Sequence, residues 1–257
     1  MLIEVEHLIS PRLIVCVSGS YSGGGHHCLP AGRARDVIRL TQTNAIVVHI
    51  PLTLDTMPEA CLGVDEIEAA FSEPPVPLLN TSRATTASQA CAMLEYALDV
   101  FSGPLGRRYR YAPLLKLEIL DDELRAVDSE VLEALTRLPP ELRNRTLPIL
   151  TPTPGSVAKA VELGCPIVRL MSGRIGQRTG IVDPTAVRRA IAVAGETPVT
   201  LEGGIDTGDD VRISAQLGAT AVLVNSAFVL TNDPLELAKQ FRRAADDAWG
   251  KATPSSL

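Results

Sequence analysis

A lysine inside an apolar stretch is the clearest sign of chemistry in this sequence. Lys116 lies in Leu-Leu-Lys-Leu-Glu-Ile-Leu (114–120), whose other residues are apolar except for Glu118. In a β-strand, residues two apart share a face, so Lys116 and Glu118 point the same way and the residues between them point the other way. An ammonium group in an apolar interior must be paired or have a lowered pKa, and the neutral lysine amine is the form that attacks a carbonyl carbon in Schiff-base chemistry. The alternative interpretation is a buried ion pair that only fixes the register of the strand.

An acidic residue near the end of a later strand is the second candidate. Glu202 lies in Val-Thr-Leu-Glu-Gly-Gly-Ile-Asp (199–206). If this strand belongs to an α/β barrel, a carboxylate near its C-terminal end is placed for proton transfer with a substrate over the barrel mouth. The residues alone do not decide whether Glu118 or Glu202 is the principal base, because coupled carboxylates near a lysine share their titration.

The residues after Glu202 are typical of an anion site. Gly203 and Gly204 allow a ligand to approach the backbone closely, and a helix expected to begin near Thr207 would aim its N-terminal amides at the same place. Asn225 and Ser226 add polar groups at the end of the next apolar segment. Phosphate sites in α/β barrels commonly lie after strands seven and eight, so we predict a phosphate site here. The alternative is that these residues only make tight turns.

Three further motifs are weaker signals. The segment Ser-Gly-Arg-Ile-Gly-Gln-Arg-Thr-Gly (172–180) could fold over an anion or form a flexible surface loop. Gly-Ser-Tyr-Ser-Gly-Gly-Gly (19–25) is loosely similar to a dinucleotide-binding loop, but no helix follows directly and no acidic residue ends the second strand. His26-His27-Cys28 could ligate a metal or contact substrate, yet no second cluster of histidine or cysteine accompanies it. We therefore expect neither a metal nor a cofactor.

The elements that position these residues alternate between apolar strands and helices. Most strands are apolar on both faces, as expected of parallel strands covered by helices on one side and by a core on the other. Eight strands alternating with about eight helices predict a (β/α)8 TIM barrel, with a doubly wound sheet as the alternative, because alternation does not show whether the sheet closes. The expected strands are 12–18, 45–50, 76–82, 114–120, 146–153, 166–172, 198–205 and 221–228.

Capping residues predict where several helices begin. We expect Thr85 or Thr86 to cap the helix in the segment 84–101, and Asp128 or Ser129 to cap the helix at 130–138. Residues 1–250 are interpreted as a single barrel domain and residues 251–257 as a disordered tail. The expected helices are 84–101, 130–138, 154–164, 183–195, 207–218 and 233–249.

Composition excludes several classes of protein. A chain of 257 residues, 46% of them apolar, can bury one large core without disulfides or metals. No apolar run approaches the roughly 20 residues of a membrane span, and the acidic N-terminus is unlike a signal peptide. A net charge of −6 without a basic segment argues against nucleic-acid binding. We expect a cytoplasmic protein with reduced thiols, because no C-x-x-C spacing occurs among Cys16, Cys28, Cys61, Cys91 and Cys165.

Five segments, taken in order and spacing, carry a family resemblance. They are Leu-Leu-Asn-Thr-Ser (78–82), Leu-Lys-Leu-Glu-Ile (115–119), Gly-Arg-Ile-Gly-Gln-Arg-Thr-Gly-Ile (173–181), Gly-Gly-Ile-Asp (203–206) and Val-Leu-Val-Asn-Ser-Ala (222–227). Through them the chain resembles bacterial thiazole synthase, which builds the thiazole ring of thiamine, roughly from residue 12 to residue 249.

The resemblance implies a role for each candidate. In that family the strand-four lysine forms an imine with the ketone of 1-deoxy-D-xylulose 5-phosphate, which implies this role for Lys116 and proton transfer for Glu118 and Glu202. The family receives sulfur as a thiocarboxylate on the C-terminal glycine of a small ubiquitin-like carrier protein and is usually a homotetramer, so both are implied here. The phosphate and sugar contacts carry over to Gly176, Gly203, Gly204, Asn225 and Ser226.

The sequence departs from the family around the predicted barrel mouth. Leu-Glu-Gly-Gly-Ile-Asp (201–206) stands where the family has Val-Asp-Ala-Gly-Ile-Gly, and Val-His-Ile-Pro (48–51) replaces a basic strand ending. Because the imine lysine is kept, these changes favour the same first steps on a different sugar phosphate. Divergent members of this kind place sulfur at C2 of a hexose phosphate, so we expect a 2-thiosugar synthase of the 2-thioglucose 6-phosphate type. The alternatives are an authentic thiazole synthase, a Schiff-base aldolase or isomerase without sulfur chemistry, and a non-catalytic phosphosugar sensor.

Overall fold

The computed structural model describes residues 2–16, 20–22, 25–27, 29–50, 70–82, 84–104 and 106–250. Cys28, Cys61, the segment 251–257 and the side chains of His26 and His27 lie outside this description. The predictions made for them therefore stay predictions.

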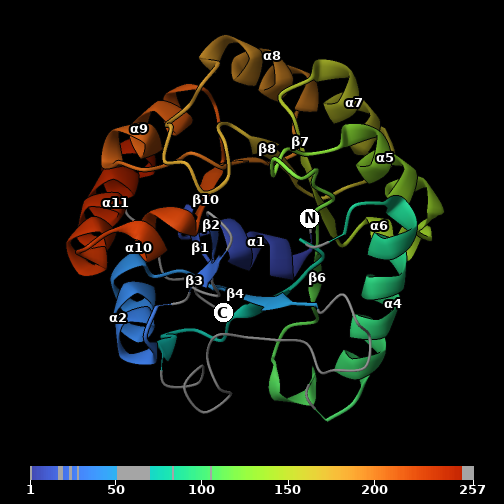
Figure 1. The fold of residues 1–257 in the computed structure, drawn as a ribbon, viewed down its shortest axis with the longest axis horizontal. Helices are drawn as coiled ribbons and strands as arrows, with labels where there is room; N and C mark the ends of the chain where they lie inside the picture. The colour runs from blue at the N-terminus through green and yellow to red at the C-terminus, as the bar shows by residue number, and fades with distance from the viewer. Residues whose placement is uncertain are drawn as a thin grey trace.

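Eight parallel strands form the centre of the molecule (Figure 1). Neighbouring strands follow the order β1-β10-β9-β8-β7-β6-β5-β4, and β1 and β4, at the two ends of this order, lie side by side. The Val15 amide donates a 3.0 Å hydrogen bond to Thr43 Oγ1 at this seam. The sheet is therefore a nearly closed (β/α)8 TIM barrel, which excludes the doubly wound alternative. The strands are β1 (Leu13–Val15), β4 (Ala45–His49), β5 (Val76–Asn80), β6 (Leu114–Leu117), β7 (Thr146–Leu150), β8 (Val168–Met171), β9 (Val199–Glu202) and β10 (Ala221–Val224).

Each strand is shorter than the sequence pattern predicts. The segment 198–205 ends as β9 at Glu202, because Gly203 and Gly204 adopt positive φ angles of 72° and 81° and leave the extended conformation. The segment 221–228 ends as β10 at Val224, because the chain turns there into a short helix. Apolar composition therefore continued past the strand ends into the turns that form the barrel mouth.

Helices surround the strands as an outer ring (Figure 1). Between β1 and β4 the chain also forms a two-stranded antiparallel ribbon of β2 (Ser20–Ser22) and β3 (Gly25–His27). The helices are α1 (Ile3–Ile9), α2 (Ala31–Thr41), α4 (Ala87–Ser102), α5 (Asp128–Arg137), α6 (Pro140–Arg143), α7 (Pro154–Glu162), α8 (Pro184–Ala194), α9 (Gly208–Gln216), α10 (Ser226–Leu230) and α11 (Pro234–Trp249), with one 3-10 turn, η1 (Gly106–Arg108).

The predicted cap is confirmed for α4 and is wrong for α5. The Thr86 side chain accepts a hydrogen bond from the Gln89 amide at the start of α4. Helix α5 instead begins at Asp128 itself, after Val127, without a side-chain cap. The Asp128 carboxylate accepts hydrogen bonds of 2.8 Å from both the amide and the hydroxyl of Thr151. It therefore joins α5 to the end of β7 rather than capping its own helix.

Helix α1, which the sequence pattern did not predict, closes the N-terminal end of the barrel. Its residues Val5, Leu8 and Ile9 are buried in one cluster with inward residues near the strand beginnings, such as Leu114 and Leu147. In Figure 1, α1 lies across the middle of the ring of strands. The barrel is therefore filled from this end, and space for a ligand remains only at the other end.

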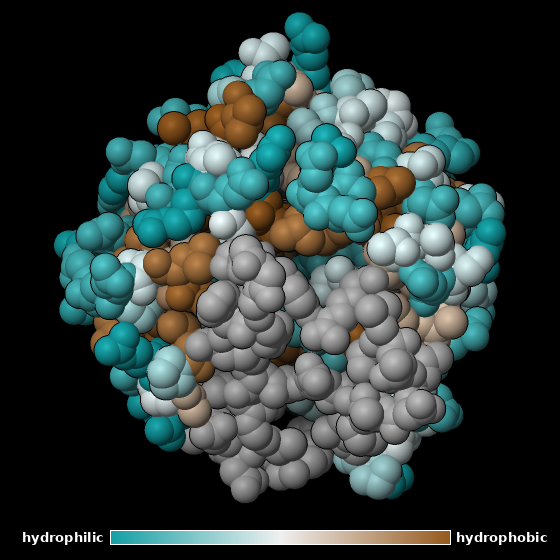
Figure 2. Space-filling view, in the orientation of Figure 1, coloured by the Kyte–Doolittle hydropathy of each residue, from teal (hydrophilic) through white to brown (hydrophobic). Residues whose placement is uncertain are grey.

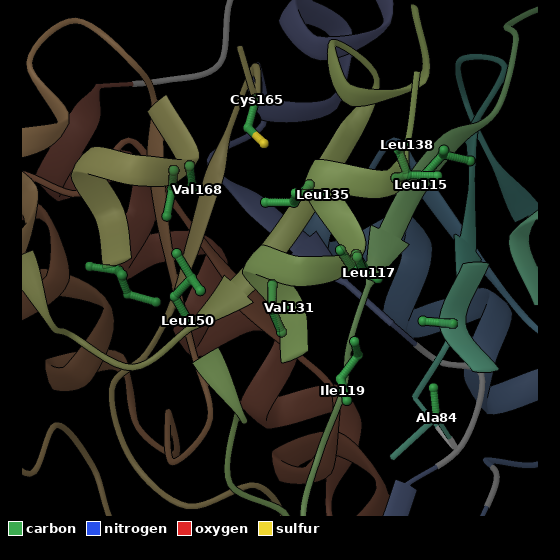
Figure 3. Packing of buried hydrophobic residues seen from close by; sticks show 14 of the residues in the cluster. Ala84, Leu115, Leu117, Ile119, Val131, Leu135, Leu138, Leu150, Cys165 and Val168 are labelled. Atoms are coloured by element: carbon green, nitrogen blue, oxygen red, sulfur yellow. The ribbon is translucent and has the colours of Figure 1, made fainter. Parts of the chain in front are cut away.

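The alternation predicted for β6 is confirmed by the packing around it. Leu115, Leu117 and Ile119 are fully buried in the layer between strands and helices, where Val131 and Leu135 of α5 meet them (Figure 3). Their neighbours at 116 and 118 must then face the barrel interior. Within the described part of the chain, no helix has both the length and the apolar character needed to cross a membrane.

Candidate active site

Lys116 and Glu118 lie side by side inside the barrel. Both are buried, with 5% and 4% of their surfaces exposed, and Lys116 Nζ donates a hydrogen bond to Glu118 Oε1. Thr81, directly after β5, holds the backbone at this point, because its hydroxyl donates to the Glu118 carbonyl and accepts from the Glu118 amide, both at 2.9 Å. The predicted pairing of Lys116 with Glu118 is therefore present.

A buried arginine that the sequence analysis missed joins this pair. Arg169 of β8 is 1% exposed, and its Nη1 and Nη2 atoms lie 3.1 and 3.2 Å from Glu118 Oε1. Nη2 also donates to the Leu117 carbonyl at 3.4 Å. The signal that identified Lys116, a cation within an apolar strand, was equally present in Val-Arg-Leu-Met (168–171).

Glu202 approaches the same arginine from β9. Its Oε1 atom lies 3.5 Å from Arg169 Nη2, and the residue is 3% exposed. Its second oxygen, Oε2, is buried and has no hydrogen-bond partner among the described residues. The structure therefore brings together all three residues predicted to be catalytic, with Arg169 linking the two carboxylates.

The surroundings shift the protonation of Lys116 toward the neutral amine. Burial lowers the pKa of Lys116 from 10.5 to about 8, and the positive charge of Arg169 acts in the same direction, while Glu202 and Cys16 oppose it. Burial also raises the pKa of Cys16 to about 11, so this thiol stays protonated at neutral pH. An amine with a pKa near 8 is partly neutral at physiological pH, which suits attack on a carbonyl carbon.

A cavity of about 330 Å³ opens above these residues at the C-terminal ends of the strands. Figure 2 shows apolar side chains near the middle of the face seen in Figure 1, with polar ones around them. Four of the five residues predicted to contact phosphate or sugar line this cavity, whereas Gly176 does not, although its neighbour Ile175 does. The four are Gly203, Gly204, Asn225 and Ser226.

Close backbone packing holds the two glycines in place. The segment 172–180 lies against the β9–α9 turn, where the Gly180 amide donates a 2.9 Å hydrogen bond to the Gly204 carbonyl. A Cβ atom on Gly204 would lie 2.5 Å from the Gly180 carbonyl oxygen, and one on Gly203 would lie 2.5 Å from that of Gly173. The segment is therefore packed at the cavity edge rather than being a free surface loop.

The start of α9 differs from the predicted anion site. The helix begins at Gly208, as expected, but the Asp210 carboxylate accepts hydrogen bonds from the amides of Asp206 and Thr207 and from the Thr207 hydroxyl. The amides of Asp206 and Thr207 are therefore already paired within the turn and are not available to a bound anion. An anion at this edge would depend instead on the glycine backbone and on the polar groups after β10.

The opposite wall of the cavity is polar. Its side chains were not among the predicted contacts, although the segments 48–51 and 78–82 that hold them were noted in the sequence. His49 at the end of β4 is buried, and its Nδ1 atom lies 3.2 Å from Ser82 Oγ. Asn80 at the end of β5 is also buried, and its Oδ1 atom has no hydrogen-bond partner within the described part of the chain. Unpaired buried acceptors are costly, so this oxygen is available to a hydroxyl group of a ligand. No group of three or more potential metal-ligating side chains occurs among the residues described.

Comparison with known proteins places the chain in a family. The family model described as thiazole biosynthesis protein ThiG matches residues 40–253. The chain belongs to the ThiG family. A thiazole synthase from Azorhizobium caulinodans is 30% identical over 172 residues, 66% of this chain and 60% of that protein. A thiazole synthase from Shewanella sediminis is 31% identical over 187 residues, 72% of this chain and 69% of that protein.

A solved structure resembles this ThiG-family chain over most of its length. The crystal structure of the BexX/CysO complex from Amycolatopsis orientalis matches it with a TM-score of 0.72 at 26% identity, covering 92% of this chain and 88% of the matched one. By contrast, the chain spans less than two thirds of several curated thiazole synthases, including the Azorhizobium caulinodans protein.

The tight packing at Gly204 predicts a measurable effect in this ThiG-family barrel. Gly204→Ala should lower the free energy of unfolding by about 2–4 kcal/mol, because the new Cβ must displace the Gly180 carbonyl in addition to tolerating a positive φ. It should also weaken binding of a ligand that occupies this cavity by about tenfold, roughly 1.4 kcal/mol, because the cavity edge moves. Urea unfolding and calorimetric titration would measure the two effects.

The control for this variant is Gly164→Ala. Gly164 has a similar φ of 86°, but nothing lies within 4 Å of a Cβ atom placed there. This control isolates the cost of positive φ, which should be about 1 kcal/mol. Equal losses of stability and affinity in both variants would contradict the role given to the Gly204–Gly180 contact.

Proposed function

We propose that this ThiG-family protein is a sulfur-inserting synthase that acts on a phosphorylated sugar through an imine at Lys116. The observation that carries the proposal is the buried Lys116 amine, with a pKa near 8, at the floor of a sugar-sized cavity and close to two buried carboxylates. Burial and pairing of this kind are what a Schiff-base lysine needs, and family membership adds support.

The proposed reaction begins with attack by the neutral Lys116 amine on the carbonyl carbon of the open-chain sugar. The carbinolamine that forms loses water and becomes a protonated imine. The imine acidifies the hydrogen on the adjacent carbon, which a carboxylate then removes to give an enamine. Glu118 touches Lys116, and Glu202 has an unpaired buried oxygen at the cavity, so we assign the proton transfers to these two residues.

We propose that sulfur comes from a carrier protein as a thiocarboxylate on its C-terminal glycine. Support comes from the BexX structure, which was solved as a complex with a second protein, CysO. The carrier would reach the sugar at the C-terminal mouth of the barrel, where the cavity opens. With the imine at C1 of an aldose phosphate, the enaminol tautomerises to a C2 ketone, and the thiocarboxylate sulfur adds to C2. The acyl group then passes from sulfur to the C2 oxygen and leaves as the carrier carboxylate, so that a C–S bond replaces the C2–O bond, and hydrolysis of the C1 imine frees Lys116. A homotetramer, as the family resemblance implies, is part of the same proposal.

For the sugar we propose a hexose phosphate, and hence a 2-thiosugar phosphate as the product. The proposal is supported by the polar cavity wall of His49, Asn80 and Ser82, whose side chains can form hydrogen bonds with the hydroxyl groups of a hexose. The changed residues Glu202 and Gly203 also lie at the cavity edge. The second candidate is thiazole formation from 1-deoxy-D-xylulose 5-phosphate, which the 30–31% identity to proteins named thiazole synthase favours.

Borohydride trapping tests the proposal and separates the candidates. The protein is incubated with glucose 6-phosphate or with 1-deoxy-D-xylulose 5-phosphate, reduced, and analysed by intact-protein mass spectrometry. A reduced adduct with the hexose phosphate supports the 2-thiosugar reaction, while an adduct with the pentulose phosphate alone supports thiazole formation. If neither sugar is trapped, the imine role is rejected and the buried ion pair becomes the better interpretation of Lys116. Retro-aldol products without a carrier would instead indicate an aldolase.

The rate of imine formation at Lys116 should increase with pH. Only the neutral amine attacks, so the initial rate of adduct formation should rise with pH through a midpoint near 8. One pH unit below the midpoint the rate should be about a tenth of its plateau. A midpoint near 10.5, the ordinary value for lysine, would show that the buried environment does not act as described.

A further inference from the structure

Arg169 is the group through which the two carboxylates of the cavity floor are linked. Its Nη1 and Nη2 atoms contact Glu118 Oε1 at 3.1 and 3.2 Å, and Nη2 lies 3.5 Å from Glu202 Oε1. The same Glu118 oxygen accepts a hydrogen bond from Lys116 Nζ. One carboxylate oxygen is therefore shared between the amine and the guanidinium group.

The charges inside the barrel are balanced by this arrangement. With all four groups ionised, Lys116 and Arg169 carry two positive charges and Glu118 and Glu202 carry two negative ones. Without Arg169, two buried carboxylates would share one lysine, and both would stabilise its ammonium form. With Arg169 present, the carboxylates are already paired, so removing a proton from Lys116 costs less.

The other groups around Lys116 do not replace this effect. Cys16, directly after β1, is protonated at neutral pH because burial raises its pKa to about 11. His49 on β4 lies against Ser82, and Asp121 and Asp122 after β6 line the outer cavity. Beside Lys116, β5 contributes the uncharged Asn80, and beside Glu202, β10 contributes the apolar Leu223. Arg169 is thus the cation that β8 brings to the floor of the cavity.

We propose that Arg169 is a positioning residue for the imine chemistry, because its guanidinium group binds Glu118 and Glu202 together and so leaves the Lys116 amine free to react in its neutral form. The inference rests on the proposed function and deepens it. Arg169 is not among the residues that line the cavity, and it acts through the two carboxylates, which are. The guanidinium group suits this task because its planar fork donates to two acceptors at once and it stays protonated.

Carbamylation by cyanate tests the inference without any sugar. Isocyanic acid adds to neutral amines, so the rate at each lysine follows its neutral fraction. The chain has four lysines, and Lys159 and Lys239 have exposed side chains, so peptide mass spectrometry provides internal references in each sample. The rate at Lys116 is measured from pH 6 to pH 10 in the wild type, Arg169→Gln, Arg169→Lys and the control Arg242→Gln. Arg242 is also buried, but its contacts are the Pro11 and Thr41 carbonyls and Asp246.

The expected order of carbamylation rates among the variants separates the effect of the Arg169 charge from a general loss of structure. Arg169→Gln keeps a hydrogen-bond donor but loses the charge, so carbamylation of Lys116 at pH 7.5 should slow by about tenfold, which corresponds to a rise of one pKa unit. Arg169→Lys should slow it by about threefold, because an ammonium group does not fork to two carboxylates. Arg242→Gln should leave the rate at Lys116 unchanged. If Arg169→Gln does not fold, the Arg169→Lys rate decides the question alone.

The outcomes also separate this inference from the proposed function. If the carbamylation rate at Lys116 is unchanged in Arg169→Gln, the role of Arg169 is overturned. When only Arg169→Lys folds, an unchanged rate in that variant has the same consequence. A slowed rate in these variants supports that role even if no sugar adduct is trapped in the wild type, in which case only the sugar chemistry is rejected. If the role of Arg169 and the sugar chemistry are both correct, the Arg169 variants should show a higher pH midpoint for sugar trapping as well as for carbamylation.

Discussion

Lys116→Ala is expected to abolish the borohydride-trapped sugar adduct and to reduce turnover by at least about a thousandfold, the order seen when the nucleophile of a covalent mechanism is removed. Among the residues that the structure describes, the other two lysines, Lys159 and Lys239, lie on the exposed faces of the outer helices and so cannot take over. Loss of the adduct is measured by intact-protein mass spectrometry, and turnover by the amount of sulfur-containing product formed with the carrier thiocarboxylate.

This loss should not come from unfolding. In Lys116→Ala, Arg169 still contacts both Glu118 and Glu202, so each buried carboxylate keeps a cationic partner. Thermal unfolding should therefore remain close to that of the wild type. Lys159→Ala, which removes an exposed lysine paired with Glu162, should retain the adduct and the full activity. An adduct that persists in Lys116→Ala would show that another group forms the imine.

Glu118→Gln is expected to lower the free energy of unfolding substantially. The substitution keeps the shape of the side chain but removes the carboxylate that both Lys116 and Arg169 contact. Breaking a buried ion pair by removing one partner typically costs about 3–5 kcal/mol, and we expect a loss near 3 kcal/mol because Lys116 can release its proton. Without the Glu118 charge the pKa of Lys116 should fall below about 8, so any residual imine formation should have a lower pH midpoint than in the wild type.

Urea unfolding measures the stability loss, and sugar trapping across pH measures the midpoint. The matched control is Glu4→Gln, because Glu4 pairs with Arg145 at 3.2 Å away from the cavity. That pair is partly solvated, so its loss should cost about 1 kcal/mol and leave the midpoint unchanged. If the Glu118→Gln midpoint rises or stays near 8, the electrostatic description of the cavity floor is wrong.

Local patterns in the sequence were sufficient for most of the barrel. Apolar strands alternating with capped helices predicted all eight strands of the barrel and the fold class, because parallel strands covered on both sides must be apolar throughout. The alternation around Lys116 correctly placed this residue and Glu118 on the inward face. These predictions depend on periods of two to four residues, which are visible within one segment.

Features that depend on distant segments were missed or misplaced. Helix α1 was not predicted because its apolar side chains pack against strand beginnings spread over the whole chain. Asp128 was expected to cap its own helix, but it bonds to Thr151, 23 residues away, which no local rule describes. The acidic N-terminus of α9 illustrates the same limit. The sequence after Thr207 could have been recognised as a capping box formed with Asp210, but whether this carboxylate takes up amides near the cavity depends on where the turn lies in the fold.

The barrel, the family resemblance and the inward pair of Lys116 and Glu118 all follow from local patterns in the sequence. Which charges share the cavity floor depends on how distant strands are placed in the folded chain. Arg169 lies on β8 and Glu118, 51 residues earlier, directly follows β6, with β7 between the two strands. They meet because barrel closure points every second side chain toward one axis. Electrostatic interactions act through space rather than along the chain, so the protonation of Lys116 depends on side chains that only folding brings together.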